Sequence, residues 1–142
     1  MVFFMDDNGV IVVSAGVLCR GNEVLLCKRP MNESPEAGKW EFPGGKTEKG
    51  ETPQQALKRE LKEELDINVE VKQLLDVRVK AYADKTILLL FYDCSLLEGK
   101  PRALEHEKIE FVPFGRVLSY DLADADRHAA QTILIDKEKT DA

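Results

Sequence analysis

The chain has 142 residues, of which 44% are hydrophobic and 32% are charged, and its formal net charge is −6. This length and composition fit one globular domain over residues 1–142 that buries a core without disulfides or a structural metal. The negative charge argues against a broad nucleic-acid-binding face, which would be basic, but is compatible with a small phosphate-bearing ligand held through a metal ion.

The first third of the chain predicts a β-hairpin followed by a long loop. Residues 10–18 are rich in β-branched side chains, and the pair Gly21-Asn22 separates them from the apolar run VLLC. Two apolar runs around such a turn are typical of a hairpin. MNESPEAGKW then predicts a polar loop, and the glycines of EFPGGKTEKGE argue against any regular element there.

Three further strands and a second helix are predicted after a helix at 52–65. Residues 67–82 and 86–96 alternate in strand fashion around a turn at 83–85, and a short strand follows at 108–114. This interleaving predicts an α/β fold, with a mixed sheet flanked by at least two helices.

The end of the chain predicts a helix over 122–137 with an apolar inner face. That face consists of Ala129, Ile133 and Leu134. Residues 137–142 are expected to fray as a charged terminus.

The cysteines and the N-terminus indicate a reducing compartment. The three cysteines, an odd number, lie in apolar runs, at Cys19, Cys27 and Cys94. This pattern favours reduced core thiols over a disulfide or zinc framework. No apolar run reaches membrane-spanning length, and MVFFMDDNGV lacks the basic start of a signal peptide. We therefore expect a cytoplasmic protein without a membrane partner.

The helix at 52–65 has a well-specified start and a clear buried face. Thr52 is expected to be the N-cap, Pro53 fits the first helical position, and Gln55 completes a capping box. The apolar stripe repeats every four residues, at Leu57, Leu61 and Leu65. The glycine-rich stretch before this helix allows a ligand to approach the backbone closely.

Three glutamates, Glu60, Glu63 and Glu64, crowd the end of this helix. Like charges at these spacings repel, and Arg59 can offset only one of them, through Glu63. Glu64 projects about 20° from Leu57, so its carboxylate should lie at the edge of the core. Oxygen ligands without cysteine or histidine suit Mg²⁺ or Mn²⁺ better than zinc. The pattern therefore favours a metal-assisted phosphate site over the alternative of a solvated charged helix.

The spacing of Gly45, Glu51, the run RELKEE at 59–64 and Ile67 resembles the Nudix box, here residues 45–67. So many residue types at fixed spacing are far more specific than a short glycine motif. One position departs from the family pattern, because Asp66 stands where a glycine usually ends the helix. Aspartate tolerates the left-handed conformation less well than glycine, so we expect a small stability cost and unchanged chemistry.

The likeness extends over most of the chain and is strongest to the MutT-like subgroup. It is carried by GKWEFPGGKTEKGETP, LLCKRP, EHEKIEFVPF and ADADRHA. The resemblance implies the Nudix fold, an α/β/α sandwich around a mixed sheet. It also implies Mg²⁺-dependent (or Mn²⁺-dependent) hydrolysis of nucleoside triphosphates to monophosphate and pyrophosphate, in particular of oxidised guanine nucleotides such as 8-oxo-dGTP.

Several alternatives stay open. Within the family, these are CTP or modified pyrimidine triphosphates, ADP-ribose and dinucleoside polyphosphates. Two further alternatives are a non-catalytic nucleotide sensor and an RNA-end hydrolase. Sensors in this family commonly lose the carboxylates of the box, which this chain keeps. An acidic surface does not favour RNA binding. The number of metal ions and the oligomeric state cannot be read from the sequence.

The resemblance also implies roles for the residues of the box. The metal ligands would be the Gly45 carbonyl and the carboxylates of Glu60, Glu63 and Glu64. Arg59 would orient these carboxylates by pairing with Glu51, so that Glu63, Arg59 and Glu51 belong to the catalytic set. The general base would be Glu105, in the loop before the last strand, with Glu107 and Glu48 as rivals.

Three further positions are candidates for substrate binding. Arg29 matches a phosphate-contacting position, although a strand-end arginine on the surface fits equally well. Asp126 matches the position that reads the nucleobase edge, and its competing explanation is an acidic residue favoured by the helix dipole. Phe42 is the aromatic candidate, but both it and Trp40 are expected mainly to pack in the core. The two histidines, His106 and His128, are expected to be surface or packing residues and not ligands.

Overall fold

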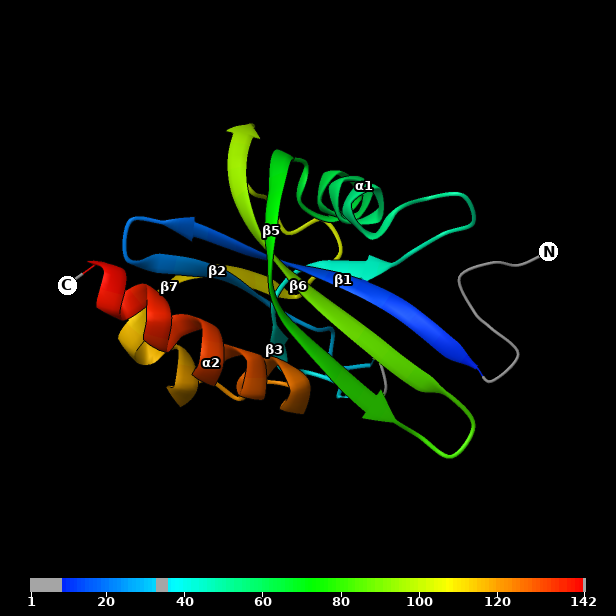
Figure 1. The fold of residues 1–142 in the computed structure, drawn as a ribbon. Coiled ribbons are helices and arrows are strands. Elements are labelled where there is room, and N and C mark those ends of the chain that lie inside the picture. The colour runs from blue at the N-terminus through cyan, green and yellow to red at the C-terminus, as the bar shows by residue number, and fades with distance from the viewer. Residues whose placement is uncertain (1–8, 33–35, 142) are drawn as a thin grey trace.

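The computed structural model describes residues 9–32 and 36–141, and within them the chain forms an α/β/α sandwich (Figure 1). The strands are β1 (Val10–Arg20), β2 (Glu23–Lys28), β3 (Trp40–Glu41), β4 (Gly44–Lys46), β5 (Asn68–Ala81), β6 (Thr86–Glu98) and β7 (Lys108–Pro113). The helices are α1 (Pro53–Leu65), the short 3₁₀ helix η1 (Phe114–Ser119) and α2 (Asp124–Asp141). The predicted α/β class and its layering, with helices on both faces of a mixed sheet, are confirmed.

β1 organises the mixed sheet. It pairs in parallel with β6, from Val10 opposite Thr86 to Leu18 opposite Cys94, and antiparallel with β2 and β4. The main order is β3-β2-β1-β6-β5, with β7 added beside β2. The hairpin at Gly21-Asn22, the turn at 83–85 and the strands around that turn are therefore confirmed.

The prediction that the stretch EFPGGKTEKGE holds no regular element is wrong. β4 pairs with β1, with Gly44 opposite Ala15 and Gly45 opposite Ser14. A Cβ on Gly44 would lie 1.9 Å from the Ser14 carbonyl oxygen, so the strands approach this closely only because residue 44 has no side chain. The glycines that argue against a strand on propensity are what this strand pairing requires.

α1 begins and ends as its sequence predicts. The Thr52 hydroxyl accepts a hydrogen bond from Gln55 N–H at 3.1 Å, and the Gln55 side chain accepts one from Thr52 N–H at 2.9 Å. Asp66 ends the helix in the left-handed conformation, with φ 58° and ψ 42°. The apolar stripe packs on one face of the sheet, in a cluster with Leu18, Tyr92 and other buried residues.

α2 covers the opposite face of the sheet (Figure 1). Ala129, Ile133 and Leu134 are buried there, as predicted, in a cluster that includes Phe91 of β6 and Phe42 from the segment between β3 and β4. The helix runs over 124–141, so its predicted end was placed too early; the fraying expected for 137–142 stays a prediction, and Ala142 lies outside the described residues.

In the part of the chain that the structure describes, no helix combines the length and apolar character needed to cross a membrane. The cytoplasmic location expected from the sequence stays a prediction.

Candidate active site

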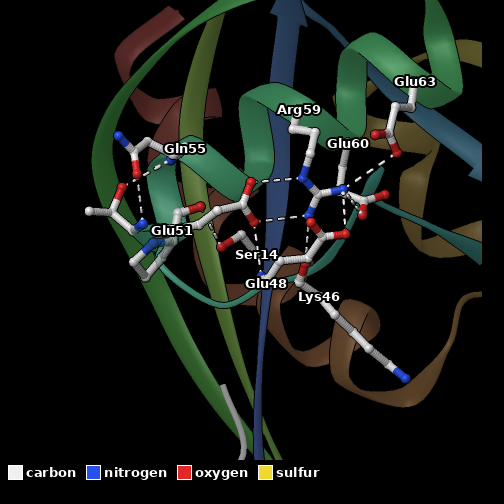
Figure 2. A network of polar contacts seen from close by, with 10 residues as sticks. Ser14, Lys46, Glu48, Glu51, Gln55, Arg59, Glu60 and Glu63 are labelled. Carbon is white, nitrogen blue, oxygen red and sulfur yellow. Dashed lines mark hydrogen bonds and ion pairs between the residues drawn. The ribbon is translucent and has the colours of Figure 1, made fainter. Parts of the chain in front are cut away.

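Arg59 is the centre of a polar network between α1 and the loop before it (Figure 2). Its Nε donates to Glu51 Oε2 at 2.7 Å and its Nη2 donates to Glu51 Oε1 at 3.0 Å, a bidentate pair. Nη2 also donates to the Lys46 carbonyl at 3.0 Å, and Nη1 donates to Glu60 Oε1 at 2.8 Å. The expected Arg59–Glu51 pair is confirmed. The hydrogen bond from Arg59 lowers the pKa of Glu51, so this carboxylate is ionised and holds the guanidinium toward Glu60.

Glu60 and Glu64 lie side by side at the edge of the core. Burial, first, and then a hydrogen bond and the charge of Glu60 raise the pKa of Glu64 to about 10. The charges of Glu105 and Glu41 add to this effect. Without a cation, the pair therefore keeps a proton at neutral pH, because two ionised carboxylates this close repel each other. A divalent cation can replace that proton.

Gly45 forms the wall against which the Glu60 carboxylate packs. A Cβ at residue 45 would lie 2.4 Å from Glu60 Cδ and 2.6 Å from Glu60 Oε2. The carboxylate can therefore occupy this position only opposite a glycine. Two convergent carboxylates in a cradle of this kind, with oxygen donors only, suit Mg²⁺ or Mn²⁺.

Glu63 lies apart from this pair. Its side chain is 54% exposed, and its Oε2 lies 3.4 Å from Arg59 Nη1 (Figure 2). Over residues 9–32 and 36–141, no three acidic, histidine or cysteine side chains are gathered closely enough to form a ready-made metal centre. The structure thus brings Glu60, Glu64 and Gly45 together, while a metal-binding role for Glu63 requires its exposed side chain to turn and stays a prediction.

A cleft of about 1160 Å³ extends from these carboxylates across the sheet. Gly45, Glu60, Glu64, Glu105 and Arg29 line one part of it, and Phe42, Leu89, Lys80, Glu36 and Asp126 also line it. It is large enough for a nucleotide, since ligand sites usually measure about 300–1,000 Å³. Carboxylates and apolar side chains therefore line one cleft.

Asp126 is buried in the first turn of α2 and faces this cleft. Its Oδ2 accepts a hydrogen bond from Phe42 N–H at 2.9 Å. Burial, first, and then the charge of Glu41 raise its pKa to about 8, so the side chain is mostly a neutral acid at pH 7. Asp126 does lie in the first helical turn, as the helix-dipole explanation requires, but that explanation does not account for its burial beside the cleft.

Phe42 contributes to the site mainly through its backbone. Its ring is 2% exposed and packs edge-on against Phe91, with centroids 5.9 Å apart, as expected for a core residue. Its backbone N–H, however, fixes the carboxyl group of Asp126. The core and the cleft wall therefore share this residue, and contact of Phe42 with substrate stays a prediction.

The three candidates for the general base differ in position. Glu105 is exposed, lines the cleft and helps to raise the pKa of Glu64. Glu48 also lines the cleft, but its side chain is 64% exposed and lies 3.6 Å from Arg59 Nη1. Glu107 is exposed and is not among the lining residues. Their geometry favours Glu105, and its role stays a prediction.

Sequence reasoning did not single out Glu41, and it underestimated His106. Glu41 lines the cleft and accepts from Arg29 Nη1 at 3.4 Å, so the predicted phosphate-contacting Arg29 already has an anionic neighbour. The side chain of His106 is only 6% exposed, in line with the expected packing role, but its Nε2 also lies 3.3 Å from Glu64 Oε1. The available signal in the sequence was that His106 directly follows the candidate base Glu105 in the same loop.

Comparisons with known proteins agree with this geometry. The model of the NUDIX domain matches residues 10–133. The chain is 45% identical over 89 residues to an 8-oxo-dGTP diphosphatase of Proteus vulgaris, covering 62% of this chain and 79% of that protein. It is 36% identical over 117 residues to the CTP pyrophosphohydrolase of Escherichia coli K12, covering 82% and 86% respectively.

A solved structure, the MutT NUDIX hydrolase from Burkholderia pseudomallei, superposes with a TM-score of 0.77 at 30% identity, over 87% of this chain and 98% of that one. The chain therefore belongs to the Nudix family. Within that family it is a MutT-like hydrolase, and its chemistry is that of a pyrophosphohydrolase.

Proposed function

We propose that the protein hydrolyses (deoxy)nucleoside triphosphates to the monophosphate and pyrophosphate, with Mg²⁺ as cofactor and 8-oxo-dGTP as the preferred substrate. The observation that carries the metal dependence is the Glu60–Glu64 pair, which keeps a proton in a cradle closed by Gly45. In that position Mg²⁺ would supply charge neutralisation for the triphosphate and activation of the attacking water.

The chain's own residues divide the remaining work. Glu60, Glu64 and the Gly45 carbonyl would hold the ion, with Glu63 joining after a side-chain rotation. Arg59 keeps Glu60 in place through their hydrogen bond. Glu105 would accept a proton from the water that attacks phosphorus, while the bond to the leaving pyrophosphate or nucleotide oxygen breaks. Arg29 would contact the phosphate chain, exchanging part of its contact with Glu41.

The side chain of Asp126 favours a nucleobase whose edge presents a hydrogen-bond donor beside a hydrogen-bond acceptor. In the neutral form its carboxyl group can donate one hydrogen bond and also accept one. Both guanine (N1–H beside O6) and cytosine (N4–H₂ beside N3) present such an edge. The Proteus relative named 8-oxo-dGTP diphosphatase favours the guanine reading, and the E. coli CTP pyrophosphohydrolase keeps CTP as a second candidate.

The direct test is pyrophosphate release from a panel of nucleotides with and without Mg²⁺. We expect the highest kcat/KM for 8-oxo-dGTP, and a role in clearing oxidised nucleotides before DNA replication would follow from it. A preference for CTP would keep the chemistry and change the substrate. Absence of turnover for every triphosphate, with ADP-ribose or a dinucleoside polyphosphate cleaved instead, would contradict the proposal.

Replacing Asp126 by asparagine is expected to change how stability depends on pH. The folded protein keeps the Asp126 proton up to about pH 8, whereas the unfolded chain releases it near pH 4. Wild-type stability therefore falls with rising pH across this window, and the variant lacks that contribution. We expect Asp126→Asn to gain on the order of 3 kcal/mol over wild type at pH 8 and little near pH 4.

Urea unfolding of both proteins at pH 4.5, 6 and 8 measures this difference. Asp124→Asn is the matched control, since Asp124 lies in the same helical turn but is exposed. Parallel stability curves for wild type and Asp126→Asn would show that Asp126 is ionised in the folded protein, against the neutral-acid role.

A further inference from the structure

The loop between β6 and β7 is fastened to the C-terminal end of α1. Arg102 N–H donates to the Leu65 carbonyl at 3.0 Å, and Leu104 N–H donates to the Glu64 carbonyl at 3.2 Å. Carbonyls in the last turn of a helix have no donor within the helix, so they need partners from elsewhere. The loop supplies them, and the end of α1 and the loop therefore move together.

Three residues after Leu104, the loop is fixed a second time. Glu107 N–H donates to the Lys28 carbonyl on β2 at 3.0 Å. The backbone is thus held at Leu104 and at Glu107, on either side of Glu105 and His106. Glu105 is exposed at the cleft, and His106 turns inward with a side chain only 6% exposed.

The imidazole of His106 meets the carboxylate of Glu64. His106 Nε2 lies 3.3 Å from Glu64 Oε1, and the Glu64 side chain is 10% exposed. A carboxylate this far out of water needs donors within the protein. Once a divalent cation has replaced the proton of the Glu60–Glu64 pair, the carboxylate can only accept, so the ring nitrogen that faces it then acts as a donor. The carboxyl group of Glu64 therefore contacts both Glu60 and the imidazole of His106.

We propose that His106 is a positioning residue for the metal site, whose Nε2–H donates to Glu64 Oε1 and holds this carboxylate toward Glu60. The inference rests on the proposed function, in which Glu60 and Glu64 bind the divalent ion. The short segment of Glu105 and His106 then has two tasks. His106 orients the metal ligand Glu64, and the same stretch of backbone places Glu105 at the cleft. Partners that orient metal-binding carboxylates typically change metal affinity by about 10- to 100-fold when removed.

The test is Mn²⁺ binding in the absence of nucleotide, followed by the electron paramagnetic resonance signal of free Mn²⁺. Phenylalanine keeps the ring shape of His106 and removes the donor, whereas the amide nitrogen of glutamine can take the place of Nε2. We expect His106→Phe to raise the Mn²⁺ Kd by about 10- to 100-fold. His106→Gln should stay within about threefold of wild type because it restores the hydrogen bond.

His128→Phe is the matched control, since it makes the same change at an exposed position of α2, and its Kd should equal that of wild type. His106→Asn carries the test if the phenylalanine variant does not fold, because its shorter side chain withdraws the donor while staying polar. A second readout is the Mg²⁺ concentration for half-maximal hydrolysis, which should rise with the Mn²⁺ Kd while kcat recovers at saturating Mg²⁺.

Equal Mn²⁺ binding by wild type and His106→Phe would overturn the inference and leave His106 a packing residue. Equal losses in the phenylalanine and glutamine variants would overturn it as well, because the hydrogen bond would then not be what matters. Both outcomes leave the proposed function intact as long as wild type binds Mn²⁺ and hydrolyses triphosphates. Failure of wild type to bind Mn²⁺ would instead overturn the proposed function together with the inference.

Discussion

A Glu64→Gln variant is expected to lose nearly all hydrolysis and yet to unfold at a higher denaturant concentration than wild type. Glutamine keeps the shape of the side chain and its hydrogen-bonding capacity but cannot bind a divalent cation as a carboxylate does. We expect kcat/KM to fall about a thousandfold, which corresponds to about 4 kcal/mol of lost transition-state stabilisation.

The gain in stability follows from the raised pKa of Glu64. The folded protein keeps this proton up to about pH 10, while the unfolded chain releases it near the ordinary pKa of 4.5. Wild-type stability therefore falls as the pH rises between these values, and glutamine removes that loss. At pH 8 the variant should be more stable by on the order of 3 kcal/mol, with the difference vanishing near pH 4.

Urea unfolding at several pH values, with and without Mg²⁺, measures both parts of this prediction. Mg²⁺ should stabilise wild type and leave Glu64→Gln unchanged, because only a folded state that binds the ion gains from it. Glu70→Gln, an exposed position on β5, is the control for both assays. A fully active variant would show that Glu64 is not a metal ligand. A variant destabilised at pH 8 would show that the pKa of Glu64 is not raised in the folded protein.

Adding one methyl group at Gly44 or at Gly45 should produce two different defects. In Gly44→Ala the new Cβ would lie 1.9 Å from the Ser14 carbonyl oxygen and 2.8 Å from Ala15 Cα, both in the backbone of β1. Backbone cannot move aside without disturbing the central strand, so we expect a loss of about 3 kcal/mol in the free energy of unfolding. The main defect expected in this variant is the loss of stability, and not a loss of activity per folded molecule.

In Gly45→Ala the atoms in the way belong to the Glu60 side chain, which can rotate. We expect this variant to keep most of its stability, to bind Mn²⁺ more weakly and to lose hydrolysis at limiting Mg²⁺. Thermal unfolding and Mn²⁺ titration of the two variants side by side separate the effects. Equal destabilisation of both, or unchanged metal binding in Gly45→Ala, would contradict the cradle described for Glu60.

Local signals in the sequence were sufficient for most of the secondary structure. The cap formed by Thr52 and Gln55 and the left-handed Asp66 were predictable because each depends on residues adjacent in the chain. The same holds for the hairpin turn and for the Arg59–Glu51 pair, whose spacing the family resemblance supplied. These features require no knowledge of how distant segments pack.

What the sequence did not reveal depends on contacts between distant segments. β4 forms because Gly44 lets the backbone of β1 approach closely. Strand propensity alone counts glycine against a strand at this position. The contact of His106 with Glu64 joins a loop to a helix some forty positions earlier in the chain. The raised pKa of Asp126 results from burial under neighbouring elements, and its position in a first helical turn gives no sign of it.

The parallel pairing of β1 with β6 has a consequence for how the protein folds. Val10 pairs with Thr86, and Gly45, Glu60 and Glu64 lie inside the chain segment that this pairing closes. Closing so long a segment costs entropy before any contact repays it, so strand pairing of this kind makes folding slow. Glu60 and Glu64 thus have no local folding unit of their own, and the sheet and the enzyme's activity should appear and disappear in one cooperative step.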